Sequence, residues 1–297
     1  MSRTERFGLS AALTTPFAED GRVDIALATA HAKSCLAKGC DSVTLFGTTG
    51  EGTSISDAER IALFEGFVAG GIPAEKIVIG VAETAIDEAI AKVRLALKGG
   101  CHTVLLLPPF YFKGVSEDGL FGWFETVLGG LGADARDIIL YHIPSVAQVG
   151  LPVTLVRRIT DAFPNAIRGV KDSGGHWPHT EALLAACPDL EILVGDERDL
   201  ARAVRAGGAG AISGMGNVFP ARVRRLAVDG IDDPAINELV EAVLTVPVTP
   251  AVKALVAHVT GDQRWARTRA PLLPTSAADA VRLVEIFDRL FSDSLAA

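Results

Sequence analysis

Features that mark membrane proteins and disulfide-stabilised secreted proteins are missing from this sequence. No apolar run approaches the roughly 20 residues that a helix needs to span a bilayer. The N-terminal segment has no apolar stretch long enough for a secretory signal peptide. The four cysteines form no CxxC pair and are expected to be reduced thiols. These absences predict a cytoplasmic protein without a membrane partner.

Basic stretches and aromatic residues are also scarce. The net charge is −8, and aromatic residues make up 6% of the chain. The densest basic cluster is Arg222, Arg224 and Arg225, which a solvated helix face explains. Because binding to phosphates needs a basic stripe, we expect no nucleic-acid partner. Hydrophobic residues, at 49% of 297 positions, suffice for a large buried core.

Short apolar runs recur along the chain, and each is followed by a longer amphipathic stretch. Several runs are apolar at nearly every position, as in parallel strands that are buried on both faces. The pattern predicts strands over residues 7–13, 42–46, 77–81, 103–107, 137–141, 166–171, 191–195 and 209–213.

The stretches between these strands carry helix signals. Ser56 and Glu59 have the spacing of a capping box, and residues 85–97 show helical apolar spacing that stops at Gly99 and Gly100. Eight alternating units predict an α/β fold, the (β/α)8 TIM barrel. An open doubly wound sheet is the rival, but it would usually have a glycine-rich turn where residues 13–17 have no glycine.

The strand pattern stops after Pro220. Helices are predicted beyond it over residues 221–227, 234–245, 251–259 and 277–295. We therefore divide the chain into a barrel of residues 1–220 and a C-terminal helical appendage of residues 221–297.

Two reactive side chains lie at carboxyl ends of predicted strands, where catalytic groups of such barrels are found: Lys171 and Tyr141. Burial would favour the neutral amine of Lys171, which can add to a ketone and form an electron-withdrawing imine. The phenol of Tyr141 can transfer protons. Spacing alone leaves two alternatives open, namely that Lys171 pairs with Asp172 and that Tyr141 is an ordinary barrel-end aromatic.

The turn Gly-Thr-Thr-Gly-Glu at residues 47–51 follows the second predicted strand. Its N–H groups can hold a carboxylate, and Thr48 can join a chain of proton transfers. An ordinary strand-to-helix turn would explain the same residues.

Three segments resemble the signatures of the dihydrodipicolinate synthase / N-acetylneuraminate lyase family: residues 47–51 (GTTGE), 141–144 (YHIP) and 169–173 (GVKDS). They occur in the family's order, and further matches extend over essentially the whole chain. The resemblance implies a class I aldolase or lyase on a TIM barrel that needs neither a metal nor an organic cofactor. It also implies a homotetramer built as a dimer of dimers.

The resemblance assigns catalytic roles to individual residues. Lys171 would form a Schiff base with pyruvate or a related 2-oxo acid, next to the proton-transferring phenol of Tyr141. Tyr111 from a neighbouring subunit would complete a relay with Thr48 and Tyr141.

Other residues would bind the substrate. They are Gly47 and Thr49 at the carboxylate, the carbonyl of Ile212 facing the lysine, and Ser173, Gly195, Asp196 and Glu197 at distal hydroxyls, as in sialic-acid lyases.

Two positions depart from the family pattern. Val146 stands where dihydrodipicolinate synthases usually carry an arginine that clamps the carboxylate of aspartate semialdehyde, and an aliphatic side chain cannot make that pair. His142 replaces the usual asparagine and is a candidate for a substrate hydroxyl or for proton transfer, although a bond to nearby backbone explains it as well. These departures favour a sugar-derived 2-oxo acid, with the lysine-biosynthetic synthase reaction as the alternative.

Two further hypotheses come from different classes of protein. The glycines between residues 207 and 216 could cradle the phosphate of a phosphosugar. A catalytically dead barrel could act as a binding protein, but intact Lys171, Tyr141 and Thr48 argue against this.

Overall fold

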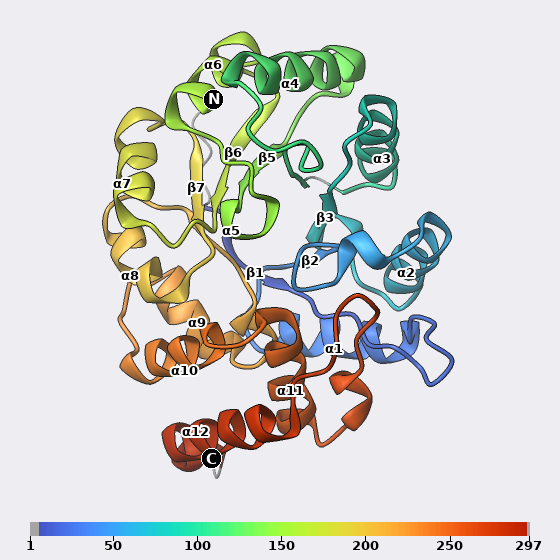
Figure 1. The fold of residues 1–297 in the computed structure, drawn as a ribbon, viewed down its shortest axis with the longest axis vertical. Helices are drawn as coiled ribbons and strands as arrows, with labels where there is room; N and C mark the ends of the chain where they lie inside the picture. The colour runs from blue at the N-terminus through green and yellow to red at the C-terminus, as the bar shows by residue number, and fades with distance from the viewer. Residues whose placement is uncertain (1–5, 102, 296–297) are drawn as a thin grey trace.

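The computed structural model describes residues 6–101 and 103–295. Within these residues, eight parallel strands close into a barrel in the order β1 to β8, with helices around it (Figure 1). The predicted (β/α)8 TIM barrel is confirmed, and the open doubly wound sheet is excluded. Among the same residues, no helix has both the length and the apolar character needed to cross a bilayer.

Every predicted strand is present, with ends that differ from the prediction by at most a few residues. The strands are β1 (Gly8–Ala12), β2 (Ser42–Leu45), β3 (Ile77–Val81), β4 (Thr103–Leu106), β5 (Ile138–His142), β6 (Ile167–Asp172), β7 (Glu191–Val194) and β8 (Gly210–Ser213). The α-helices are α1 (Ile25–Ala37), α2 (Asp57–Ala69), α3 (Ile86–Lys98), α4 (Glu117–Leu131), α5 (Pro144–Ala147), α6 (Val153–Ala162), α7 (Trp177–Ala186), α8 (Glu197–Arg205), α9 (Pro220–Ala227), α10 (Pro234–Leu244), α11 (Val248–Thr260) and α12 (Ala277–Leu295). Short 3-10 helices are η1 (Gly52–Ser54), η2 (Ala74–Lys76), η3 (Gly132–Asp134), η4 (Met215–Asn217) and η5 (Gln263–Ala266).

The strands are buried on both faces, which explains their continuous apolar runs. One core fills the barrel and includes Leu105, Ile139 and Leu193. The other lies between the strands and the surrounding helices and includes Val104 and Leu140. Successive residues of a strand therefore face opposite layers, and this alternation decides which side chains can reach a central site.

The predicted helix ends are confirmed at α2 and α3. The hydroxyl of Ser56 accepts from the N–H of Glu59, and the Glu59 carboxylate accepts from the N–H of Ser56, which completes the capping box. Helix α3 ends directly before Gly99 and Gly100. Gly100 has φ +93°, a conformation that glycine adopts without strain.

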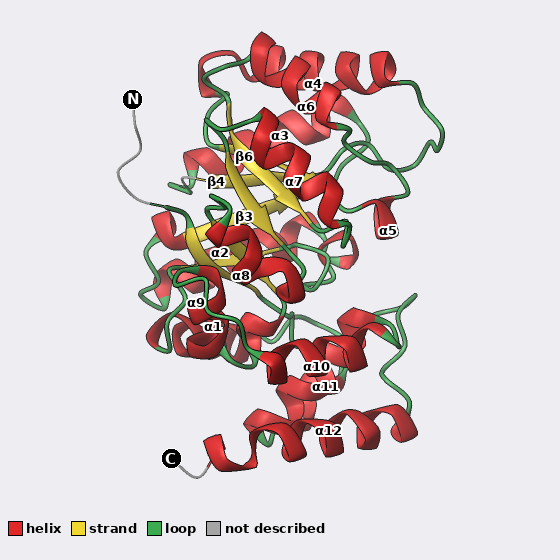
Figure 2. Cartoon of the chain, turned by 90° about the vertical axis from the view of Figure 1, so that its left-hand side faces the viewer, coloured by secondary structure: helices red, strands yellow, loops and turns green. Residues whose placement is uncertain are grey.

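The helices predicted beyond residue 220 are all present. Helices α10, α11 and α12 pack together at one side of the barrel (Figure 2). Helix α9 instead packs against β1 and β8 and covers the last strand. The division at residue 220 remains a prediction; by its packing, α9 belongs with the barrel, and the appended helices begin at α10.

A buried ion pair joins the appended helices to the barrel. The Nζ of Lys253 on α11 lies 2.5 Å from Oε1 of Glu51, and both side chains are fully buried. Lys253 also donates to the carbonyl of Thr15 at 2.9 Å, and Glu51 accepts from the N–H of Arg269 at 2.9 Å. Since Glu51 ends the turn of residues 47–51, the pair fixes that turn against α11.

Lys253→Met should lower the free energy of unfolding by about 3–5 kcal/mol, because it leaves the Glu51 carboxylate buried without its counter-ion. Arg289→Met is the matched control. Arg289 pairs with Glu238 at the surface, where the two side chains are 58% and 49% exposed, and such a pair contributes about 0–1 kcal/mol. Denaturant titration measures both variants, and equal losses would contradict this role of the buried pair.

Candidate active site

The ends of β5 and β6 bring the predicted lysine and tyrosine together. Tyr141 and Lys171 are register partners on these strands. The Nζ of Lys171 donates to the Tyr141 hydroxyl at 3.2 Å and lies 4.3 Å from the ring centroid. Each residue is only 5% exposed. The amine is thus shielded from bulk water and adjacent to a phenol that can pass protons.

Asp172 does not form the ion pair that spacing alone left open for Lys171. Asp172 is the next residue along β6, so its side chain faces the helix layer rather than the barrel interior. Its carboxylate contacts the side chains of His179 and Thr180 instead. The Lys171 amine is therefore not paired with Asp172 and lines the cavity described below.

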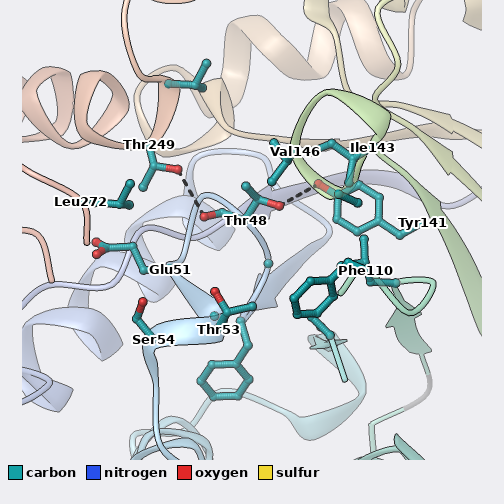
Figure 3. A pocket seen from close by; sticks show the side chains of 18 of the residues that line it. Thr48, Glu51, Thr53, Ser54, Phe110, Tyr141, Ile143, Val146, Thr249 and Leu272 are labelled. Carbon is teal, nitrogen blue, oxygen red and sulfur yellow. Dashed lines mark hydrogen bonds between the residues drawn. The ribbon is translucent and has the colours of Figure 1, made fainter. Parts of the chain in front are cut away.

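Thr48 extends the polar chain from the turn after β2. Its Oγ1 lies 3.3 Å from the Tyr141 hydroxyl (Figure 3). Thr249 on α11 fixes the turn from the other side, donating to the carbonyl of Thr48 at 3.2 Å. Thr48, Tyr141 and Lys171 form a continuous sequence of hydroxyl, phenol and amine through which a proton can move.

Two adjoining cavities meet at Thr48 and Tyr141. The first, of about 360 Å³, is lined by the predicted site residues Thr48, Thr49, Tyr141, Lys171, Ser173, Gly195, Asp196, Glu197 and Ile212. The second, of about 450 Å³, includes Gly47 and has mainly apolar walls, among them Phe110, Ile143 and Leu272 (Figure 3). The first cavity contains the amine and is the candidate substrate site.

Asp196 and Glu197, which follow β7, have different contacts. Asp196 caps α8 through the N–H of Arg198 at 3.1 Å and also binds the Arg198 guanidinium at 3.0 and 2.7 Å. Glu197 accepts from the hydroxyl of Ser213 at 2.5 Å and from the N–H of Met215 at 3.4 Å. Burial raises the pKa of the Glu197 carboxyl. Asp196 thus both caps α8 and lines the cavity, whereas Glu197 braces the end of β8.

Gly195 is required by the close approach of β7 to Ser173. A Cβ atom at Gly195 would lie 2.1 Å from the Ser173 hydroxyl oxygen. The N–H of Ser173 donates to the carbonyl of His142 at 2.8 Å, which sets this residue at the cavity wall.

His142 and Tyr111 lie outside the cavity that contains Lys171. His142 is buried on the outer side of β5, where its Nδ1 accepts from the N–H of Leu151 at 2.9 Å. This corrects the expectation that His142 binds the substrate; the bond to nearby backbone is the one realised. Tyr111 is 73% exposed in the segment after β4, and its ring packs edge-on against Phe112. Within one chain it does not reach Tyr141.

The profile of the dihydrodipicolinate synthetase family matches residues 5–289 of the sequence. The chain belongs to this family. It is 34% identical over 299 residues to an uncharacterized DapA-like lyase of Chloroflexus aurantiacus, covering 96% of this chain and 97% of the relative. It is 30% identical over 301 residues to a 4-hydroxy-tetrahydrodipicolinate synthase of Sorangium cellulosum, covering 98% of each. The crystal structure of a dihydrodipicolinate synthase from Agrobacterium tumefaciens superimposes with a TM-score of 0.95 at 55% identity, covering 96% of this chain and 100% of that one.

The family match confirms both the family and the lyase class that the sequence predicted. It also weakens the phosphate-cradle hypothesis, since at least one glycine of this stretch, Gly210, has a structural explanation. A Cβ atom at Gly210 would lie 1.9 Å from the carbonyl oxygen of Gly8, so this glycine is needed where β8 meets β1.

Some residues that line the cavity were not predicted from the sequence. Arg198 lines the cavity beside Asp196, and it was detectable as the basic residue directly after the acidic pair. Thr249 and the apolar wall formed by Val240, Val243 and Val252 come from α10 and α11. Their place depends on how those helices dock, for which the local sequence carries no signal.

Proposed function

We propose that the protein is a lyase in which Lys171 forms a Schiff base with pyruvate or a related 2-oxo acid. The supporting observation is the contact of the buried Lys171 amine with the Tyr141 phenol, which in turn contacts Thr48. Members of the dihydrodipicolinate synthetase family use pyruvate, which is consistent with this assignment.

The reaction follows from the chemistry of these groups. The Lys171 nitrogen adds to the ketone carbon, and the resulting carbinolamine loses its hydroxyl as water to give the imine. Tyr141 donates a proton to the departing hydroxyl, and the resulting phenolate is reprotonated through Thr48. The imine then draws electrons from the neighbouring carbon, so that a carbon–carbon bond forms or breaks or a β-hydroxyl leaves as water. Hydrolysis of the final imine restores the free lysine.

The substrate carboxylate is assigned to the turn of residues 47–51. Gly47, Thr48 and Thr49 follow β2 at the carboxyl end of the barrel, where backbone N–H groups can bind an anion. Ile212 on β8 lines the same cavity, and we assign its carbonyl to face the lysine, as the family resemblance implies.

We further propose a sugar-derived 2-oxo acid as the substrate. Beyond the lysine, Ser173, Asp196 and Arg198 line the cavity and offer both donors and acceptors to hydroxyl groups. Val146 is 59% exposed and lines both cavities, and it cannot clamp a second carboxylate.

Two basic side chains of the barrel, Arg168 and Lys113, do not take the place of the missing arginine. Arg168 pairs with Glu191 at the opposite end of the barrel, at 2.7 Å. Lys113 donates to the backbone carbonyls of Phe110 and Ala147.

A second copy of the chain is proposed to complete the site. Tyr111 and Phe112 are each 73% exposed, and the apolar 450 Å³ cavity beside Thr48 and Tyr141 is large enough to receive an aromatic side chain. We assign that place to Tyr111 of a neighbouring subunit in a homotetramer, as the family resemblance implies.

The Schiff base can be tested by incubating the protein with pyruvate and borohydride and locating the added mass by peptide mapping. We expect a reduced pyruvate adduct on Lys171 that is absent from Lys171→Ala. Lys113→Ala is the matched control and should be labelled like the wild type. An unlabelled wild-type protein, or undiminished labelling of Lys171→Ala, would refute the mechanism and favour a binding protein.

Tyr141→Phe should keep the fold but lower kcat about 10²–10⁴-fold, because it removes the proton-transferring hydroxyl while keeping the ring. Steady-state turnover of the identified substrate and the unfolding midpoint measure the two effects. Wild-type turnover in this variant would contradict the relay. A matching loss in Tyr111→Phe would support the contribution of a second subunit.

The alternative substrate is aspartate semialdehyde, which the names of the Sorangium and Agrobacterium relatives favour. A panel of sugar-derived 2-oxo acids should be turned over with a higher kcat/KM than pyruvate plus the semialdehyde, because Val146 cannot clamp a second carboxylate and the guanidinium of Arg198 is paired with Asp196. Efficient condensation with the semialdehyde would show that the interpretation of Val146 is wrong.

A further inference from the structure

A cluster of three ionisable side chains lies directly behind the lysine and the tyrosine. His142 and Asp172 are register partners on β5 and β6, one residue beyond the pair Tyr141 and Lys171. Because successive strand residues face opposite layers, His142 and Asp172 point away from the cavity, toward the helices. His179 on α7 joins them, and ligand-type atoms of the three side chains lie within 4.8 Å of one another.

The hydrogen bonds of His179 indicate the protonation state of its ring. Its Nδ1 lies 3.0 Å from Oδ2 of Asp172, and its Nε2 lies 3.1 Å from the carbonyl oxygen of Leu151. A carboxylate and a carbonyl can only accept, so both ring nitrogens must donate and the ring is an imidazolium. A metal ion bound through either ring nitrogen of His179 would have to displace one of these two hydrogen bonds.

His142 is the neutral partner of this imidazolium. Its Nδ1 accepts from the N–H of Leu151 and therefore carries no proton. The two rings stack with centroids 4.1 Å apart and an interplanar angle of 18°. Burial, together with the charge of His179, lowers the pKa of His142 to about 4. The backbone of Leu151 is thus held by both rings, through its N–H and its carbonyl.

Asp172 connects this cluster of side chains to the wall of the substrate cavity. Its Oδ1 accepts from the N–H of Gly174 at 2.9 Å, and its Oδ2 accepts from the hydroxyl of Thr180 at 2.8 Å. Gly174 lines the cavity together with Ser173. The cluster therefore connects α7 and the segment before α6 to the strand end that carries Lys171.

We propose that His179 is a positioning residue for the lyase reaction: its imidazolium, held between Asp172 and Leu151, fixes the ends of β5 and β6 and so keeps Lys171 beside Tyr141. This inference rests on the proposed Schiff-base function. His179 touches neither the substrate cavity nor the reacting atoms.

Activity should therefore depend on the protonation of His179. The hydrogen bond to Asp172 raises the pKa of His179, so the clamp is intact below that raised value and is lost as the pH rises through it. The charged or titratable groups that face the cluster are Asp172 on β6, His142 on β5 and His176 at the start of α7, which opposes protonation of His142. Burial raises the pKa of Asp199 on α8, and the charge of Asp172 makes a small contribution in the same direction.

The test is the pH profile of kcat and of borohydride trapping by pyruvate. The wild type should lose activity at alkaline pH at the point where the ring nitrogens of His179 titrate in a ¹⁵N-histidine spectrum. His179→Gln should lower kcat about 10²-fold and remove this limb, because an uncharged amide cannot donate to both partners in the same geometry. Asp172→Asn should keep more activity yet lose the limb, since an amide donor suits a neutral His179.

His258→Gln is the matched control, because His258 pairs with Asp288 at 2.8 Å in the appended helices, remote from the cavity. It should retain the wild-type kcat and pH profile. If His179→Gln and Asp172→Asn keep the alkaline limb, or if His179 titrates at a pH unrelated to it, the inference is overturned while the Schiff base stands. If the wild type forms no pyruvate adduct, the proposed function itself fails.

Discussion

The pairing of β5 with β6 is the constraint on which the site depends. Parallel strands in a closed barrel have a fixed register, and here that register sets Tyr141 opposite Lys171 and His142 opposite Asp172. The first pair faces the barrel interior and the second faces the helix layer. A slip of β5 by one residue against β6 could put His142 opposite Lys171 and turn Tyr141 toward the helix layer, so that the amine would lose its phenol partner. The chemistry of the cavity and the support behind it are consequences of a single register.

The appended helices are part of the site rather than an independent addition. They supply one wall of the cavity that contains Lys171, and Thr249 fixes the carbonyl of Thr48. The buried pair of Lys253 and Glu51 holds the same turn at its other end. Because a charge with no partner is costly in an apolar interior, the pair favours the arrangement in which these helices dock with Lys253 against Glu51. The strand ends alone would leave the turn of residues 47–51 without this support.

The sequence was sufficient for the barrel and for the central polar chain, but not for the direction of every side chain. Strands buried on both faces have clear apolar runs, and Lys171, Tyr141 and Thr48 lie at or just beyond the ends of predicted strands. His142 also ends a strand, yet it faces outward, because it lies one residue beyond Tyr141 in a structure of period two. The bracing role of Glu197 and the cavity wall from α10 and α11 depend on contacts between distant segments. The place of Tyr111 depends on a second copy of the chain, which no local pattern describes.

The central claim is that Lys171 is a nucleophile held beside Tyr141 and not a structural cation. A crystal structure of the protein grown with pyruvate tests it most directly. We expect continuous density from the Lys171 Nζ to the keto carbon of pyruvate, with the Tyr141 hydroxyl within hydrogen-bond distance and the carboxylate at the turn of residues 47–49. Pyruvate bound in the cavity with a free Lys171 amine, or with its carboxylate at another wall, would contradict it.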